Sequence, residues 1–335
     1  MKKKIWLTLF TLLAGSTLAA CGSNSGNESE GAGENNDEKL SIITTFYPIY
    51  DFTQNVVGDE GDVELLIPAG TEPHDFEPSA KQIAQIQDAD AFVYHNENME
   101  TWVPDTVEGW EKGKPNIIKG TEGIKLTAAS DEHEEGDEHE SEDEHRHSHE
   151  YDPHTWVDPK LAIKEVEAIS KQLSKDYPEK QEAFEENTEN YVKELEDLDK
   201  EYEESLSNAP QKSFVTQHAA FGYLANEYDL NQLAISGLSP DEEPSPERLA
   251  ELKDYVEDNN IHYIYFEKNA SDKIAKTLAD EVGVKLEVLN PLESLTDEQI
   301  DHGEDYISVM KDNLKALEKT TDTKGKEIQP EESEE

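Results

Sequence analysis

Three histidines and one glutamate are candidate ligands for a divalent metal ion. They stand in predicted loops, three of them beyond a predicted strand: His74, His154, His218 and Glu293. Ligands of open α/β sheets bind outside the carboxyl ends of the strands, so such loops could bring these side chains together. Imidazole and carboxylate groups bind Zn²⁺. A single histidine is more often a surface or structural residue than a ligand, so spacing alone leaves both interpretations open.

Other polar residues could compete with these ligands or support them. Glu267 also ends a predicted strand, so it could replace Glu293 as the fourth ligand or hydrogen-bond a ligating ring. Three aspartates near the histidines are candidates for the same support, with exposed loop carboxylates as the alternative: Asp75, Asp152 and Asp158. His95, which follows the predicted strand 91–94, is interpreted as a structural or rim residue.

The segment 131–150 has an unusual composition, because eleven acidic residues and five histidines stand among its twenty residues. It contains no apolar residue that could be buried, so we expect a surface loop, 128–150, inserted into the first lobe. Its histidines predict several weak zinc sites that capture the ion: His133, His139, His145, His147 and His149. The alternative is a solvated acidic loop without a metal role.

Motifs of several enzyme classes are absent from the sequence. It contains no GxxxxGK[ST] phosphate loop, GxGxxG fingerprint, GxSxG elbow or HExxH motif. His149 and His154 are five residues apart, and Pro153 opposes a helix between them, so the pair does not fit a metalloprotease helix. No catalytic residue is predicted.

Composition limits the partners further. The chain has 335 residues and a formal net charge of -49, from 29 Lys and Arg against 78 Asp and Glu. This length predicts two domains, and this charge disfavours nucleic acid, whose phosphates are bound by Lys and Arg. A single cysteine excludes an intramolecular disulfide and a thiolate cluster, so a metal site must use histidine and carboxylate.

The cysteine stands at the end of an N-terminal segment that resembles a bacterial lipoprotein signal. Three lysines in residues 1–4 precede the short apolar run 5–14, and small residues lead to Cys21. We expect residues 1–20 to be a signal peptide and Cys21 to be lipidated, which would anchor the protein on the extracytoplasmic face of the cell membrane. The alternative is a secretory signal with an incidental cysteine. Residues 21–38 lack apolar anchors and predict a flexible tether.

Short apolar runs alternate with helical patterns in the rest of the chain. Eight runs are predicted strands: 40–46, 62–67, 91–94, 116–118, 213–216, 232–235, 263–266 and 285–289. A capping box of Ser79 and Gln82 opens a predicted helix, 80–87, and Ser245 caps another that begins at Pro246. The alternation predicts an α/β fold with two parallel-sheet lobes, 39–160 and 209–320, followed by a disordered tail, 321–335.

A helical segment, 161–208, separates the lobes and includes one long helix over about 178–207. Its apolar residues form a single stripe: Phe184, Tyr191, Leu195, Leu198, Tyr202 and Leu206. At 1.5 Å per residue, such a helix spans about 40 Å, enough to run along both lobes as a rigid linker. A coiled-coil seam is the alternative.

Four motifs together resemble the zinc-specific solute-binding lipoproteins of bacterial ABC importers, in the cluster A-I metal-receptor family that includes zinc- and manganese-uptake proteins and related adhesins. They are HDFEPS at His74, DPHTWVDP around His154, QHAAFGYLA at His218 and NPLE ending at Glu293. The resemblance covers residues 40–317. It implies a metal ion in a cleft between two lobes, bound by these four residues.

The resemblance also implies a function and partners. A monomeric Zn²⁺ receptor would pass its ion to a membrane permease and the ATPase subunit of that permease. Manganese-specific relatives carry glutamate and aspartate at the third and fourth positions, where this chain has His218 and Glu293, and imidazole favours zinc. Four protein ligands leave no position for a hydrolytic water, so we expect no enzyme. The alternatives are a manganese receptor, an adhesin with a structural metal and a metallohydrolase.

Overall fold

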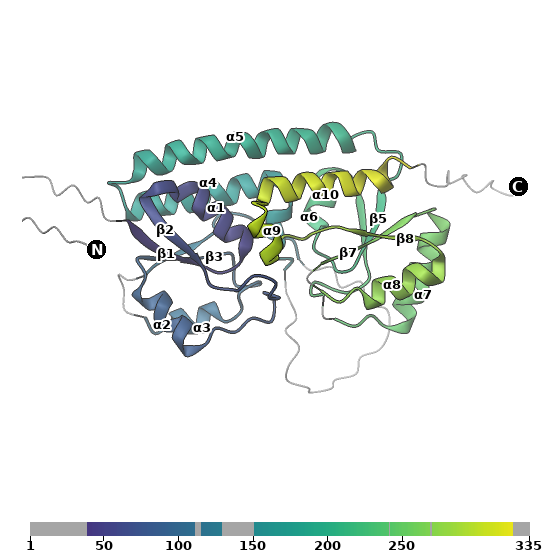
Figure 1. The fold of residues 1–335 in the computed structure, drawn as a ribbon, viewed down its shortest axis with the longest axis horizontal. Helices are drawn as coiled ribbons and strands as arrows, with labels where there is room; N and C mark the ends of the chain where they lie inside the picture. The colour runs from purple at the N-terminus through teal and green to yellow at the C-terminus, as the bar shows by residue number, and fades with distance from the viewer. Residues whose placement is uncertain (1–38, 111–114, 129–150, 241, 269, 324–335) are drawn as a thin grey trace, which may run out of the picture. The chain divides into compact units, whose positions relative to one another are not determined.

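Two four-stranded parallel sheets carry the fold (Figure 1). The computed structural model describes residues 39–110, 115–128, 151–240, 242–268 and 270–323. Both sheets lie within one unit, Glu38–Glu335. This arrangement confirms the predicted α/β fold with two parallel-sheet lobes.

The first sheet has the strand order β2-β1-β3-β4. Its strands are β1 (Leu40–Thr44), β2 (Gly61–Leu65), β3 (Ala91–Tyr94) and β4 (Asn116–Lys119). The connections contain α1 (Tyr47–Val57), the 3₁₀ turn η1 (Gly58–Glu60), α2 (Ala80–Asp88) and α3 (Val103–Val107). The strand order reverses between β1 and β3, which is where open α/β sheets bind their ligands.

The second sheet repeats this topology with the order β6-β5-β7-β8. Its strands are β5 (Ser213–Thr216), β6 (Asn231–Ala234), β7 (Tyr263–Phe266) and β8 (Lys285–Val288). The connecting helices are α6 (Gly222–Glu227), α7 (Pro246–Asp258) and α8 (Lys273–Val282). Here the reversal lies between β5 and β7, so the second sheet offers a ligand position equivalent to that of the first.

The remaining elements join the two sheets and follow the second one. The 3₁₀ turn η2 (Thr155–Val157), α4 (Pro159–Asp176) and α5 (Gln181–Leu206) connect the sheets, and α9 (Asp297–Asp301) and α10 (Tyr306–Thr321) follow β8. Thr321, which the sequence assigns to the tail, is therefore the last residue of α10. Within the described residues, no helix combines the length and apolar composition needed to cross a membrane.

All eight predicted strands are present. Three have the predicted bounds, and five differ from the prediction only at their ends. β1 stops at Thr44 rather than Phe46, because Phe46 is the N-cap of α1 and Pro48 stands in its first turn. β2 stops at Leu65, although the N–H groups of Leu66 and Ile67 still donate to the carbonyls of Thr44, the last residue of β1, and Thr45 at 2.8 and 3.0 Å. Both predicted serine caps, on α2 and α7, form.

Helices cover both faces of each sheet (Figure 1). One face of the first sheet packs on α2 and α3 through a core that includes Phe92 and Ile86, and the corresponding face of the second sheet packs on α7 and α8 through Ile264 and Leu252. The opposite faces share a single core that runs from Ile42 of β1 to residues of the second sheet and α10. This shared core joins the lobes.

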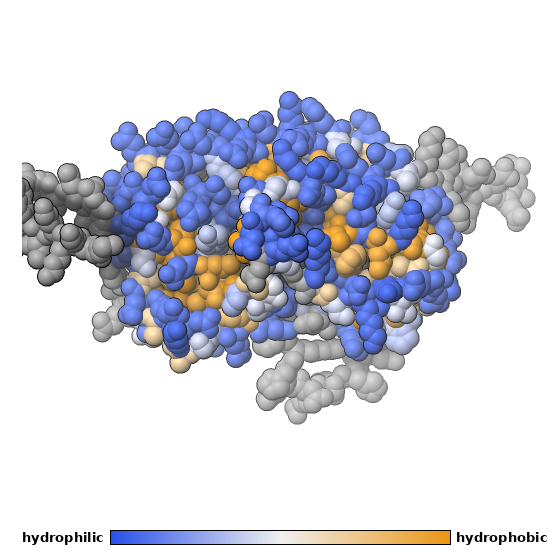
Figure 2. All heavy atoms as spheres, in the orientation of Figure 1, coloured by the Kyte–Doolittle hydropathy of each residue, from blue (hydrophilic) through white to orange (hydrophobic). Residues whose placement is uncertain are grey.

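The long helix α5 runs along the shared core and contributes its buried stripe to it. All six residues of its predicted apolar stripe are buried, and α5 packs against α1, α4 and α10 of the same chain rather than in a coiled coil. Its 26 residues span about 39 Å at 1.5 Å per residue. Figure 2 shows that the outward side, at the top of the view, is mainly hydrophilic, which agrees with one buried stripe on a charged helix.

Several predictions concern residues outside the described part of the chain. These are the signal peptide 1–20, the lipidated Cys21 in its tether, the five histidines of segment 131–150, and all but the first three residues of the tail. The structure does describe the two ends that border the histidine-rich segment. Ala128 and Tyr151 form an antiparallel bridge, and the N–H of Asp152 donates to the carbonyl of Thr127 at 2.9 Å.

Candidate metal centre

The four predicted ligands come from loops of both lobes. His74 lies in the loop between β2 and α2, and His218 stands two residues beyond β5. Glu293 lies in the loop after β8, and His154 is the N-cap residue of η2. All four residues are buried. The centre therefore lies where loops from the carboxyl ends of β2, β5 and β8 meet the segment that precedes α4.

The donor atoms of these residues meet at one point, all within 4.8 Å of one another. The Nε2 atoms of His74, His154 and His218 lie 3.4, 3.3 and 3.1 Å from the Oε1 atom of Glu293. The Nε2 atoms of His74 and His154 are 3.2 Å apart. Tetrahedral zinc with bonds of about 2.0–2.1 Å needs donors roughly 3.3–3.4 Å apart. These four separations, 3.1 to 3.4 Å, are close to the edges of that tetrahedron.

Two carboxylates orient the rings of His154 and His218 by contacting the ring nitrogen that faces away from the centre. The Nδ1 atom of His154 lies 2.7 Å from Oδ1 of Asp152, which also accepts the backbone N–H of His154 at 2.9 Å. The Nδ1 atom of His218 is hydrogen-bonded to Oε1 of Glu267. Each contact turns the Nε2 atom of the ring toward the centre. Histidine ligands of metals commonly have such a partner on the second ring nitrogen.

Glu293 stands in a tightly held loop. Asn313 of α10 accepts the N–H of Asn290 at 2.8 Å and donates to the carbonyl of the same residue at 2.7 Å. Leu292, fully buried, has a φ of 63°, which a non-glycine residue adopts only when its surroundings enforce it. Local strain therefore accompanies the placement of the Glu293 carboxylate.

Contacts across the centre tie the loops of one lobe to those of the other. The indole Nε1 of Trp156 donates to the carbonyl of Pro291 at 2.7 Å, and the hydroxyl of Tyr306 donates to the carbonyl of Trp156 at 2.6 Å. The N–H of Gly70 donates to the hydroxyl of Ser294 at 2.7 Å. Because these bonds join both lobes beside His154 and Glu293, they hold the donors from both lobes together.

Burial and charge act differently on the three histidines. Burial lowers the pKa of His74 to about 4, so this ring is neutral near pH 7. Burial also lowers the pKa of His218, but the carboxylates of Glu267 and Glu293 raise it more, and its pKa lies well above the usual value. The pKa of His154 is raised for the same kind of reason, through Asp152 and Glu293. Two rings thus favour holding protons when no metal is bound.

Burial and neighbouring charges also shift the pKa values of the acidic side chains, in different directions. Burial would raise the pKa of Glu293, but His218 and the other two rings hold it well below its usual range. Glu267 has a raised pKa, mainly because it is buried. Glu72, which accepts the backbone N–H of His74 at 3.0 Å, has a pKa raised to about 8 by burial and by the charge of Glu293. Sequence reasoning missed Glu72, since nothing in its local pattern shows that it faces this centre.

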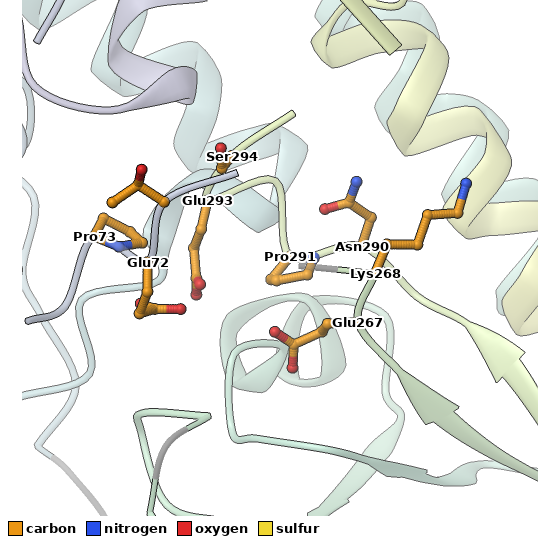
Figure 3. A pocket seen from close by; sticks show the side chains of 9 residues that line it. Glu72, Pro73, Glu267, Lys268, Asn290, Pro291, Glu293 and Ser294 are labelled. Atoms are coloured by element: carbon orange, nitrogen blue, oxygen red, sulfur yellow. The ribbon is translucent and has the colours of Figure 1, made fainter. Parts of the chain in front are cut away.

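A small pocket gives access to one side of the centre. Figure 3 shows Glu72 on one side of this pocket and Glu267 with Lys268 on the other, with Glu293 between them. The histidine rings are not among the residues that line it. A metal ion entering here would therefore meet carboxylate oxygens before imidazole nitrogens.

Three residues that the sequence singles out have other roles. Asp75 is exposed, and Asp158 is the N-cap of α4, where its carboxylate accepts the N–H of Lys160 at 2.9 Å. Neither carboxylate has a described contact with the four candidate ligands, because the helix cap turns Asp158 away and Asp75 faces solvent. His95 is fully buried and is therefore structural rather than a rim residue.

Comparison with known proteins identifies the family. The family described as "Zinc-uptake complex component A periplasmic" matches residues 42–320. The chain belongs to this family. Its match includes all four candidate ligands and both sheets from Ile42 onward.

Individual relatives of this zinc-uptake family agree with that assignment. The chain is 58% identical over 298 residues to the zinc-binding lipoprotein AdcA of Streptococcus pneumoniae, covering 89% of this chain and 59% of AdcA. It therefore spans about six-tenths of the length of that relative. It is 50% identical over 315 residues to the high-affinity zinc uptake system protein ZnuA of Bacillus subtilis, covering 94% of this chain and 97% of ZnuA.

A solved structure in the same family supports the fold. The Zn(II)-bound ZnuA-like domain of AdcA from S. pneumoniae has a TM-score of 0.74 to this protein and 57% sequence identity. The match covers 85% of this chain and all of that domain. The fold predicted from the resemblance is therefore confirmed by a relative that was solved with zinc.

The contact between Asp152 and His154 leads to a testable prediction. We expect Asp152→Ala to weaken zinc binding by about 10- to 100-fold, as is typical when the partner of a metal-bound histidine is lost. Competition with a chromophoric chelator measures the change. The exposed Asp75 provides a matched control, and Asp75→Ala should leave the affinity unchanged. Equal affinities for the two variants would show that Asp152 does not orient the ring.

Proposed function

We propose that His74, His154, His218 and Glu293 together bind one Zn²⁺ ion and that the protein is an extracytoplasmic zinc receptor that delivers this ion to an ABC-type permease. The main support is the separation of the donor atoms, 3.1 to 3.4 Å along the four edges given above, which fits a tetrahedral zinc site. The zinc-uptake family and the zinc-bound relative agree with this choice of ion.

The donor set favours zinc over manganese and a carrier over an enzyme. Three imidazoles and one carboxylate suit Zn²⁺, whereas Mn²⁺ prefers a larger share of oxygen ligands. Four protein donors complete a tetrahedron and leave no position for the reactive water that a catalytic zinc site keeps. Glu267 bonds to the Nδ1 atom of His218, which suits a supporting role and leaves Glu293 as the fourth ligand.

Burial of the donors favours retention of the ion until a partner acts on the protein. Each donor residue is buried, and the bonds of Trp156 and Gly70 close the space between the lobes. Release then requires these contacts to loosen, which docking on the permease and its ATPase subunit would bring about. A lipidated Cys21 would keep a monomeric receptor beside that permease on the extracytoplasmic side of the membrane.

The first test is metal content and stoichiometry. Protein purified without added metal is expected to contain zinc rather than manganese by elemental analysis. Calorimetric titration of the metal-free protein should give one tight zinc equivalent in the full chain, and also in a variant that lacks residues 131–150. Loss of the tight equivalent on that deletion, or a tight site for manganese instead, would contradict the proposal. Adhesion that persists after all four donors are replaced would favour the adhesin alternative.

A further inference from the structure

A second buried pair of ionisable residues lies behind the centre, outside the donor set. His95 follows β3 directly, and Glu165 stands in α4. Both side chains are fully buried, with the Nδ1 atom of His95 3.2 Å from Oε2 of Glu165. The His95 ring also packs edge-to-face on Phe46 and Trp156, with ring centroids 5.7 and 5.0 Å apart. Burying two ionisable groups is costly, so their retention calls for a role.

The pair contacts the backbone segment that carries His154. The Nε2 atom of His95 lies 2.6 Å from the carbonyl oxygen of Pro153, and the hydroxyl of Thr155 donates to Oε1 of Glu165 at 2.5 Å. Pro153 and Thr155 are the two residues that flank His154. The pair therefore fixes the chain on both sides of one candidate ligand.

The hydrogen bonds define where the proton of His95 lies. A carbonyl oxygen only accepts, so Nε2 must carry a proton and donate to Pro153. Nδ1 then faces the Glu165 carboxylate. Burial lowers the pKa of His95, but Glu165 and Glu100 raise it by more, so the pKa lies above its usual value. The Nδ1 atom and Oε2 of Glu165 are close enough for a charge pair, but they are not aligned for a hydrogen bond.

Asp152 and this pair act on different parts of His154. Asp152 bonds to the Nδ1 atom and the backbone N–H of His154, which sets the direction of the ring. The pair instead holds the carbonyl of Pro153 and the side chain of Thr155, the two residues beside His154. A metal centre binds its ion most tightly when the ligands are already held in place, because the binding step then pays little entropy to fix them.

We propose that His95 and Glu165 are positioning residues that clamp the residues on both sides of His154, Pro153 by its carbonyl and Thr155 by its hydroxyl, and so preorganise the zinc centre. This role rests on the proposed zinc-binding function. Loss of the clamp lets the His154 segment move, which weakens zinc binding and distorts the tetrahedral geometry while the fold persists.

Two substitutions at Glu165 test this role. We expect Glu165→Ala to weaken zinc binding by about 10- to 100-fold, the range found when groups that support a metal ligand are removed. Glu165→Gln should restore affinity close to that of the unmodified protein, because its amide oxygen can accept from Thr155 and its amino group can donate to a neutral His95. Chelator competition measures zinc, and visible absorption of the Co²⁺-loaded protein reports tetrahedral geometry.

Controls separate positioning from general stability. Val166→Ala removes a fully buried side chain next to Glu165 on α4 and should lower the free energy of unfolding without changing zinc affinity or the Co²⁺ spectrum. The inference would be overturned if the folded Glu165→Ala variant matched the unmodified protein in zinc affinity and Co²⁺ spectrum. It would also be overturned if the Glu165→Gln variant bound zinc as weakly as the Glu165→Ala variant.

A further variant covers the case in which Glu165→Ala does not fold. Thr155→Val keeps the shape of the side chain and removes only the hydroxyl, which donates to Glu165 and also lies 3.3 Å from Nε2 of His95. It should weaken zinc binding, and unchanged affinity would overturn the inference. Failure of the unmodified protein to bind zinc would instead contradict the proposed function, so the two failures are distinguishable.

Discussion

Replacing His154 with alanine is expected to weaken zinc binding by about 100- to 1000-fold. Four-ligand zinc sites bind with about 10–16 kcal/mol, so one ligand in four accounts for roughly 2.5–4 kcal/mol, and each 1.4 kcal/mol is about tenfold. The Nε2 atom of His154 lies within 3.3 Å of both His74 Nε2 and Glu293 Oε1, so its removal leaves a gap between these two donors. Chelator competition at fixed pH measures the affinity.

Replacement of His74 or His218 should produce losses of the same order, with one difference. Removing His218 also leaves Glu267 and Glu293 without the ring that lies between them, so His218→Ala should reduce the stability of the metal-free protein as well. His302→Ala is the matched control, since His302 is exposed at the end of α9. Wild-type affinity in any of the three ligand variants would remove that residue from the site.

The fold was largely predictable from the sequence because its signals are local. Short apolar runs in a parallel sheet are bounded by polar residues, which sets the strands to within about two residues. The α5 stripe follows the helical period, and the serine caps of α2 and α7 are short-range patterns. The end of β1 was misplaced because the N-cap of α1 takes over a residue that is apolar enough to continue the strand.

The candidate site was predictable only in part, because its assembly depends on long-range contacts. Strand ends pointed to His74, His218 and Glu293, but convergence with His154 came from the four motifs considered together. The supporting residues show the limit more clearly. Asp152 and Asp158 lie in one short motif, yet one bonds to His154 and the other caps α4. Sequence proximity does not decide which way a carboxylate turns.

The contact between the two residues behind the centre could not be predicted from the sequence, for the same reason. His95 and Glu165 are 70 positions apart. Taken alone, His95 is interpreted only as a structural or rim residue, and a glutamate such as Glu165 is usually exposed. Only the packing of α4 beside β4 and η2 brings Glu165 to the residue that follows β3. A local pattern cannot carry that information.

Acidification is expected to weaken zinc binding with a slope approaching about two decades per pH unit, because each proton that zinc must displace contributes about one decade per unit. His154 and His218 supply these protons, since nearby carboxylates hold the pKa of each ring above its usual value. His74 contributes none above about pH 5, since burial lowers its pKa to about 4. Calorimetry in buffers with different ionisation enthalpies counts the released protons, and a count near zero would contradict this origin.

The thermal stability of the metal-free protein is expected to increase on acidification, whereas the zinc affinity decreases. A group whose pKa is raised by folding stabilises the fold fully below its unfolded pKa, which is 6.5 for His218, and this contribution is lost as pH rises through the folded value. The metal-free protein should therefore melt at a higher temperature near pH 6 than at pH 9, where Glu267 and Glu293 lose the charge of His218. The increase in melting temperature caused by zinc should grow over the same interval, because the ion replaces the protons as the positive charge between these carboxylates. Melting curves of both forms across this range would contradict the prediction if the zinc-dependent increase stayed constant.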